Sequence, residues 1–213
     1  MSHEKQPRRR AAGRPGSGAA VGKERIVQAA LALLREQPPE KLTVVEIASA
    51  ADVDPALLRY YFGGKKGVLR AAAQTLLADV QERSAEVFGK GGSLRDRIRK
   101  RLELLIALHE EHPRFLDLVF NEVYAANEEA DAPADVAEIV DRALVLTHTM
   151  LGDSPSGADE RYLHVAILGV TTFFVRARPL LDQLFPAASH ESVKLGYIDF
   201  LTDLIAKGLR RTS

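Results

Sequence analysis

The chain has 213 residues, which is enough for one large or two small domains, and 46% of them are hydrophobic, so a sizeable core can form. It contains no cysteine, which excludes disulfides, thiolate metal sites and a cysteine nucleophile. The formal net charge is zero, yet residues 1–70 hold 13 Lys/Arg and 7 Asp/Glu, whereas residues 71–213 hold 16 and 22. We therefore expect any polyanion to bind the N-terminal third.

Residues 1–22 are polar, basic and rich in Gly, Ala and Pro, and they lack apolar periodicity. This composition predicts a disordered tail when the protein is free. Within it, Gly13-Arg14-Pro15 is similar to the core of an AT-hook, a segment that enters the DNA minor groove. Two interpretations stay open for this tail: a solubilising extension, or an arm that contacts DNA.

No signal peptide or membrane span is predicted. The N-terminus lacks a basic start followed by an apolar run. The longest apolar run, from Val165 to Val175, is too short to span a bilayer, which needs roughly 20 residues. We expect that run to be a buried helix, and the protein to be cytoplasmic without a membrane partner.

Three helices are predicted between residues 23 and 62. The first runs from about Lys23 to Glu36 and ends before Pro38-Pro39; its apolar positions are Ile26, Ala30, Leu33 and Leu34. Thr43 then caps a second helix, and Glu46 completes a capping-box pattern. Asp52 occupies a turn position that favours left-handed backbone.

The third helix begins with Asp54 as its cap and Pro55 at its first position, where a missing N–H has no cost. Leu58 and Phe62, four residues apart, face the core. The outer face is then formed by Ala56, Arg59 and Tyr60.

Everything after Lys65 has a helical pattern, with candidate helices at 65–88, 93–111, 113–127, 133–151, 159–178 and 190–210. Glycines and prolines mark the breaks, including the stretch from Pro179 to Ala188. No alternating apolar and polar segment is bounded by turn signals, so no sheet is expected. The predicted fold class is all-α, with an N-terminal three-helix head and a C-terminal helical bundle.

Residues 23–69 resemble the DNA-binding domain of the TetR family of bacterial transcriptional regulators. The segments that carry the resemblance are Thr43-Val-Val-Glu-Ile-Ala, Ala51-Asp-Val-Asp-Pro-Ala-Leu-Leu-Arg-Tyr-Tyr-Phe and Lys65. It implies an all-helical homodimer that reads double-stranded DNA at a pseudo-palindromic operator. It also implies three regions: a tail (1–22), a helix-turn-helix domain (23–68), and a domain (69–213) that dimerises and binds a small molecule.

The resemblance also assigns roles to single residues. Thr43 and Val45 match positions that meet the DNA backbone or a base; Pro55, Ala56 and Arg59 match major-groove positions; Tyr61 and Lys65 match phosphate contacts. Tyr60 joins this DNA-binding set because it lies on the outer face of the third helix. Three departures from the family pattern stand out: Asp52 replaces the turn glycine, Gly64 replaces a polar cap, and Leu57 replaces a phosphate-binding hydroxyl.

Arg59 is the expected base reader on physical grounds as well. Arginine is the commonest bidentate partner of guanine, and Arg59 is the one side chain on the outer face able to act so. Pro55 and Ala56 offer apolar contact, and Tyr61 and Lys65 would position the protein on phosphates without reading sequence. Outside this motif, a solvated surface charge would be the better interpretation of Arg59.

The last helices are apolar on more than one side, which predicts burial between two layers. A second subunit could supply one layer, and the predicted interface residues are Val165, Phe173, Tyr197, Leu201 and Leu204. The alternative is an ordinary monomer core. We favour the dimer because a single head reads too few base pairs.

The middle helices carry polar groups among apolar ones, a pattern typical of a ligand pocket. The predicted lining, for a small lipophilic ligand, is His109, Phe115, Phe120, Asn121, Tyr124 and His148, with Asn121, Tyr124 and His148 as orienting groups. Each could equally be a core or surface residue. His109 and His112 share a helix face, but a solvated helix end explains them better than a metal site, and we expect neither metal nor cofactor.

The leading hypothesis is a transcriptional repressor that a small ligand releases from its operator. The alternative is a DNA-binding adaptor that recruits a protein partner without a ligand, which predicts a filled C-terminal core. An enzyme is not expected, because the sequence has no nucleophile elbow, phosphate-binding glycine loop or metal-ligand cluster.

Overall fold

In the computed structural model the chain is all-helical throughout the part that is described, which confirms the predicted fold class. The structure describes residues 17–89, 91–124, 133–152 and 159–210, except for the side chains of 17–21, 89, 123–124, 133–137 and 210. Across these ranges there is no strand. The tripeptide Gly13-Arg14-Pro15 lies outside the described residues.

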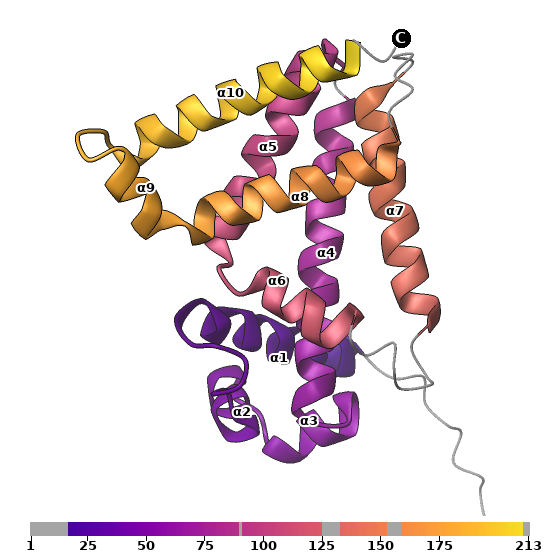
Figure 1. Cartoon of the computed structure of the whole chain (residues 1–213). Coiled ribbons are helices and arrows are strands. Elements are labelled where there is room, and N and C mark those ends of the chain that lie inside the picture. Colours follow the sequence, from indigo (N-terminus) through magenta and orange to yellow (C-terminus); the bar gives the residue numbers. More distant parts are fainter. Residues whose placement is uncertain (1–16, 90, 125–132, 153–158, 211–213) are drawn as a thin grey trace, which may run out of the picture.

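Three helices form the head at one end of the molecule: α1 (Ser17–Glu36), α2 (Val44–Ala51) and α3 (Pro55–Phe62) (Figure 1). The predicted start of the first helix at Lys23 is wrong, because α1 begins six residues earlier and takes in residues 17–22 of the expected tail. Alanine at positions 19 and 20 has the highest helix propensity, which favours this extension. The predicted end before Pro38-Pro39 is confirmed.

The predicted caps of α2 and α3 are confirmed. Thr43 Oγ1 accepts a hydrogen bond from Glu46 N (3.2 Å), and Glu46 Oε2 accepts one from Thr43 N (2.8 Å), which completes the capping box. Asp52 has φ +52°, the left-handed conformation expected for the turn. Asp54 Oδ1 accepts from Ala56 N at 2.7 Å, with Pro55 directly after it. These local bonds fix where each helix of the motif begins and ends.

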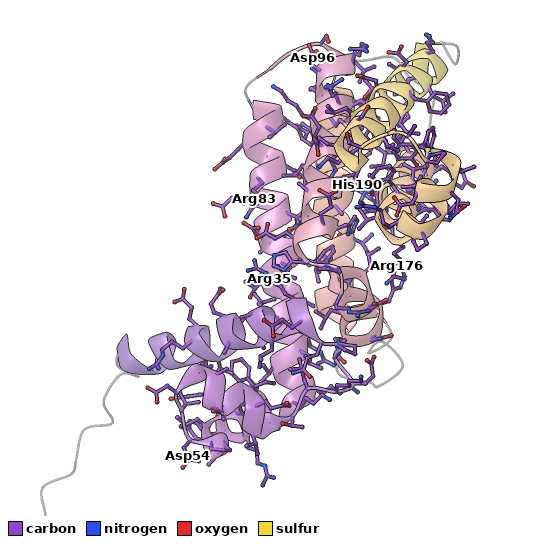
Figure 2. The ribbon with its side chains drawn as sticks, turned by 90° about the vertical axis from the view of Figure 1, so that its left-hand side faces the viewer. Arg35, Asp54, Arg83, Asp96, Arg176 and His190 are labelled. Carbon is purple, nitrogen blue, oxygen red and sulfur yellow. The ribbon has the colours of Figure 1, made fainter. Side chains whose placement is uncertain are left out.

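Helix α4 (Lys65–Gly89) runs without a break from the head into the C-terminal half (Figure 1). It packs against α1 and α3 at the head, and the buried residues of the two halves form one continuous core. The expected domain boundary at 68/69 therefore falls inside a helix. An ion pair between Arg35 and Glu111 (2.8 Å) adds a second link, at the junction seen in Figure 2.

Gly67, in the first turns of α4, lies against the end of α3. A Cβ atom added at this position would be 1.7 Å from the carbonyl oxygen of Phe62. Only glycine permits this approach, so α3 and the start of α4 are held in close backbone contact.

The C-terminal half consists of α4 together with α5 (Leu94–Glu111), α6 (Phe115–Leu118), η1 (Val119–Tyr124), α7 (Pro133–Leu151), α8 (Glu160–Arg176), α9 (Arg178–Leu184) and α10 (His190–Arg210). Helices α8 and α10 both pack on α5, and α7 packs on α4 and α8 (Figure 1). The expected helices at 65–88, 93–111, 133–151 and 190–210 match within a residue.

Two expectations for this half are wrong. The helix expected at 113–127 begins at Phe115 and becomes the π-helix η1 at Val119; in η1 the Glu122 carbonyl accepts a hydrogen bond from Arg70 Nε of α4 (3.2 Å). The expected break at 179–188 contains most of α9, because Pro179 lies in its first turn, where proline is tolerated. Helix α8 bends into α9 by 75°.

Among the described helices, none is by itself both long and apolar enough to cross a membrane. The bent pair of α8 and α9 meets that requirement of length and composition only when the two are taken together.

The Gly67 contact predicts opposite effects for the same substitution at two glycines. Gly67→Ala should lower the free energy of unfolding by more than about 1 kcal/mol, because the new methyl group overlaps backbone that cannot rotate away. Gly208→Ala in α10, where no atom lies within 4 Å, should raise it by about 0.5–1 kcal/mol. Urea unfolding of both variants measures the difference, and equal effects would show that α3 and α4 are not in close contact.

Candidate functional site

The outer face of the head carries four side chains that the described part of the chain leaves exposed. Val45 on α2 and Ala56, Arg59 and Tyr60 on α3 are exposed, with Val45 67% and Tyr60 80% accessible. Leu58, on the opposite side of α3, is fully buried, so the helix is anchored by one side and free on the other. Figure 2 shows Asp54, the cap of α3, at the tip of the head farthest from the C-terminal half.

Two of the predicted phosphate or backbone contacts already have partners within the protein. Thr43 Oγ1 donates to Glu46 Oε2 (2.7 Å) as part of the capping box. This bond, together with the one from the Thr43 backbone N–H, lowers the pKa of Glu46. Lys65 Nζ donates to the Glu40 carbonyl oxygen (3.1 Å), which leaves its other two N–H groups for a further acceptor. Both residues are thus held in place rather than mobile.

Tyr61 differs from its exposed neighbour. Its ring is half-buried and packs on the core, with its centroid 5.1 Å from that of Tyr60 in an edge-on arrangement. The Nζ atom of Lys23 lies 5.5 Å from the Tyr61 centroid, a distance suited to a cation–π contact. Tyr61 therefore connects α1 to the outer end of α3.

Of the residues predicted to line a ligand pocket, those whose side chains are described do not form one set. His109 and Phe115 are buried side by side, with ring centroids 5.9 Å apart, and burial lowers the pKa of His109 to about 4. Phe120 and Asn121 are exposed on η1, and His148 is exposed on α7, 2.6 Å from Glu160. The side chain of Tyr124 lies outside the described residues.

The prediction of a shared pocket for these residues is therefore wrong for His109 and Phe115, which belong to the core, and for Phe120, Asn121 and His148, which are at separate surface places. The reason is rotational: a shift of one residue moves a side chain about 100° around a helix. His109 and His112 also have different surroundings, since His109 contacts Thr172 while His112 Nε2 is 3.7 Å from Glu111. No group of three metal-ligating side chains occurs among the described residues.

Instead, a groove opens between α4 and α7. It has a volume of about 600 Å³ and is lined by Gln81, Ala85, Glu138, Asp141, Arg142, Val145 and Leu146. A second hollow of about 250 Å³ continues along the same helices to Gln74 and Leu77. Sequence reasoning missed the groove, although the run Leu144-Val145-Leu146 puts apolar groups on more than one side of α7 and could have indicated it.

Four helices also bring polar side chains together inside the C-terminal half. The side chains are those of Ser84 on α4, Arg101 on α5, Thr147 on α7 and His164 on α8. Arg101 donates to Ser84 Oγ, and Thr147 Oγ1 is 3.1 Å from His164 Nδ1. Sequence reasoning missed this set too; the signal was that Arg101 shares a helical face with Ile98, Leu102 and Leu105, which are buried.

An apolar face covers the outer sides of α8 and α10. Of the predicted interface residues, Val165, Phe173 and Leu204 are exposed, and Tyr162 and Phe200 extend the same face. Tyr197 is half-buried and donates its hydroxyl to the Val170 carbonyl (3.0 Å), which joins the two helices. Leu201 is only 5% exposed, so it belongs to the core and is removed from the predicted interface.

Comparison with known proteins identifies the head. Residues 26–72 match the family model for bacterial regulatory proteins of the tetR family. Over 78 residues the chain is 32% identical to the HTH-type transcriptional regulator BetI of Rhizobium meliloti (strain 1021), an alignment that spans 37% of this chain and 38% of that relative.

Solved structures share the fold of nearly the whole chain. The fatty acid degradation regulator FadR from Bacillus halodurans aligns with a TM-score of 0.64 at 16% identity, over 89% of this chain and 97% of its own. FadR from Bacillus subtilis, solved in complex with stearoyl-CoA, aligns with a TM-score of 0.62 at 18% identity, over 84% of this chain and 97% of its own.

Proposed function

We propose that this chain, whose head matches the family model of the TetR family of bacterial transcriptional regulators, is a repressor that a small ligand releases from its operator. The observation that carries the proposal is the continuity of α4. One uninterrupted helix joins the helix-turn-helix head to a C-terminal half that contains a groove. A ligand that displaces α4 would therefore displace the head.

In the proposed complex α3 lies in the major groove, with Arg59 reading a base. Arg59 is exposed on the free side of α3, and no described residue holds its side chain in an ion pair or hydrogen bond. Ala56 and Pro55 would give apolar contacts, and Tyr60 and Val45 would border them. Lys65 and Tyr61, anchored at the end of the motif, would hold phosphates, and Thr43 would meet the backbone at the start of α2.

We propose that the apolar face of α8 and α10 covers the same face of a second copy. Val165, Phe173 and Leu204 are large apolar side chains that this face leaves exposed, and a contiguous apolar face on a protein surface usually marks an interface. A two-fold axis there would place two heads on successive half-sites, as a pseudo-palindromic operator needs.

The proposed ligand is small and lipophilic, and its proposed place is the α4–α7 groove. The groove volume of about 600 Å³ falls in the usual range of ligand sites, roughly 300–1,000 Å³. The stearoyl-CoA in the Bacillus subtilis structure supports the idea that this fold admits ligands with long apolar chains.

Two contacts would carry displacement toward the head. The π-helix η1 packs on α4 through the bond from Arg70 to the Glu122 carbonyl, and the Arg35–Glu111 pair joins α1 to α5. A shift of α4 against α5 changes both.

Arg59→Ala should relax base preference at one position in each half-site, with a loss of about 1–3 kcal/mol of discrimination there. Selection of binding sites from a random DNA pool, followed by titration of matched sites, measures this. Arg83→Ala, which removes an exposed arginine from α4 far from the head, is the control (Figure 2). If the Arg59→Ala variant selected the same DNA sequences as the unaltered protein, the assignment of Arg59 as a base reader would be contradicted.

Phe173→Glu should convert a dimer into a monomer, because the charge would be buried against the partner without a counter-ion. Sedimentation velocity measures the change, and specific DNA binding should fall about 10³-fold or more, toward the nonspecific level. Val140→Glu on α7, also exposed, should leave the dimer intact. Dimers of the Phe173→Glu variant would place the interface elsewhere.

Ligand release is the test of function. Lipophilic compounds that raise the melting midpoint should weaken operator binding by about 5- to 150-fold, and the operator should weaken binding of the compound by the same factor. Fluorescence anisotropy and calorimetry measure the two sides of this equality. The alternative, an adaptor that recruits a protein partner, predicts that no compound changes the affinity for DNA.

A further inference from the structure

Arg101 lies in the interior of the C-terminal half with a positive charge that the described protein does not balance. Its side chain is 6% exposed, on the face of α5 that also carries Ile98, Leu102 and Leu105. Burial lowers its pKa to about 10, so the guanidinium is still charged at neutral pH, and no described carboxylate contributes to that pKa. A buried charge without a counter-ion is costly.

Among the described residues, the Arg101 side chain has one hydrogen-bond partner, and it is a neutral hydroxyl. Its Nη1 donates to Ser84 Oγ, and Ser84 Oγ donates in turn to the Val80 carbonyl (2.6 Å). A guanidinium carries five N–H donors in a fork whose geometry matches a carboxylate or phosphate. Most of that binding capacity is therefore open to a further acceptor.

The neighbouring groups favour an anion rather than a second cation. Thr147 Oγ1 donates to the Ala143 carbonyl (3.1 Å), so the bond to His164 Nδ1 has the imidazole as donor. Burial and then the charge of Arg101 lower the pKa of His164, which keeps the imidazole neutral. The set therefore holds one positive charge and no negative one.

This polar set lies next to the groove. Ala85 follows Ser84 on α4, and Leu146 precedes Thr147 on α7, and both Ala85 and Leu146 line the groove. The groove wall is mostly apolar at this end, since Val145 and Leu146 stand beside Ala85. Ser84, Arg101 and Thr147 do not themselves line the groove, so a terminal group of an apolar body in it would reach Arg101 only past the wall that Ala85 and Leu146 form.

We propose that Arg101 binds the anionic head group, a carboxylate or a phosphate, of an amphipathic ligand whose apolar body lies in the α4–α7 groove. This inference rests on the proposed ligand-binding function of the C-terminal half and names the chemistry of its ligand. Arg101 does not itself line the groove, so the head group enters only when α4 and α7 move apart. The same anion that neutralises Arg101 would thus displace α4.

Three probes with one alkyl chain separate the head groups: decanoate, decyl phosphate and decan-1-ol. Binding to the full chain is measured by calorimetry and by the melting midpoint, without DNA. At least one of the two anions should bind more tightly than the alcohol, and the better anion identifies the head group. Arg101→Met should weaken binding of that anion by roughly 10- to 100-fold while leaving decan-1-ol unchanged.

Two further variants control the result. Arg83→Met removes an equal charge from the exposed side of α4, where Arg83 pairs with Asp79, and should bind the anion as the unaltered protein does. Arg101→Lys retains the charge and should bind with intermediate affinity, which keeps the test valid if Arg101→Met fails to fold. Without ligand, Arg101→Met should melt at the same temperature or higher, since it removes an unbalanced buried charge.

Equal binding of the anion by Arg101→Met and the unaltered protein would overturn the inference, as would anions that bind no better than decan-1-ol. Neither result bears on whether another compound releases DNA. The proposed function fails separately, if compounds that bind leave the affinity for DNA unchanged.

Discussion

Helix α4 has to satisfy two sets of neighbours at once, and the rest of the molecule is arranged around that requirement. Its early turns pack on α1 and α3, and the same helix contacts α5, α7 and η1. Ala72 and Ala73 of α4 are both fully buried, and such small side chains allow neighbouring helices to approach closely. A larger residue at either place would push the head away from the C-terminal half. The two halves therefore share a core instead of meeting at an interface.

The C-terminal half departs from the usual distribution of charge and apolar surface in two places. Arg101 puts a charge inside, and Phe173 and Val165 put large apolar groups outside. Each is unfavourable for one isolated copy in water. A ligand anion would compensate the first and a second copy the second. On this view the features that disfavour the lone protomer would define its partners, and the excess of acidic residues after residue 70 would favour contact with DNA at the basic N-terminal third.

The head could be predicted closely because its signals are local. Thr43, Asp52 and Asp54 act on backbone groups within three or four residues, so their roles follow from spacing alone. The C-terminal half depends on which helices converge. The π-helix η1 is accompanied by a bond from Arg70, 52 residues away, and the buried Arg101 donates to Ser84, 17 residues away on another helix. Asn121 and His148 showed the right chemistry for a pocket, but both are exposed, on different helices, and neither lines the groove.

The glycine at position 67 has a consequence for how far the head can move. Since no side chain separates the end of α3 from α4, the backbones of Phe62 and Gly67 are in direct contact, and α3 moves with the start of α4. A tilt of α4 is then a tilt of α3 through the same angle, and the displacement at the tip grows with distance from the pivot. DNA half-sites recur every 34–36 Å or so, about ten base pairs, with one face of the duplex accessible at each repeat. A rigid arm of this kind turns a small angular change into a mismatch of phase with the double helix.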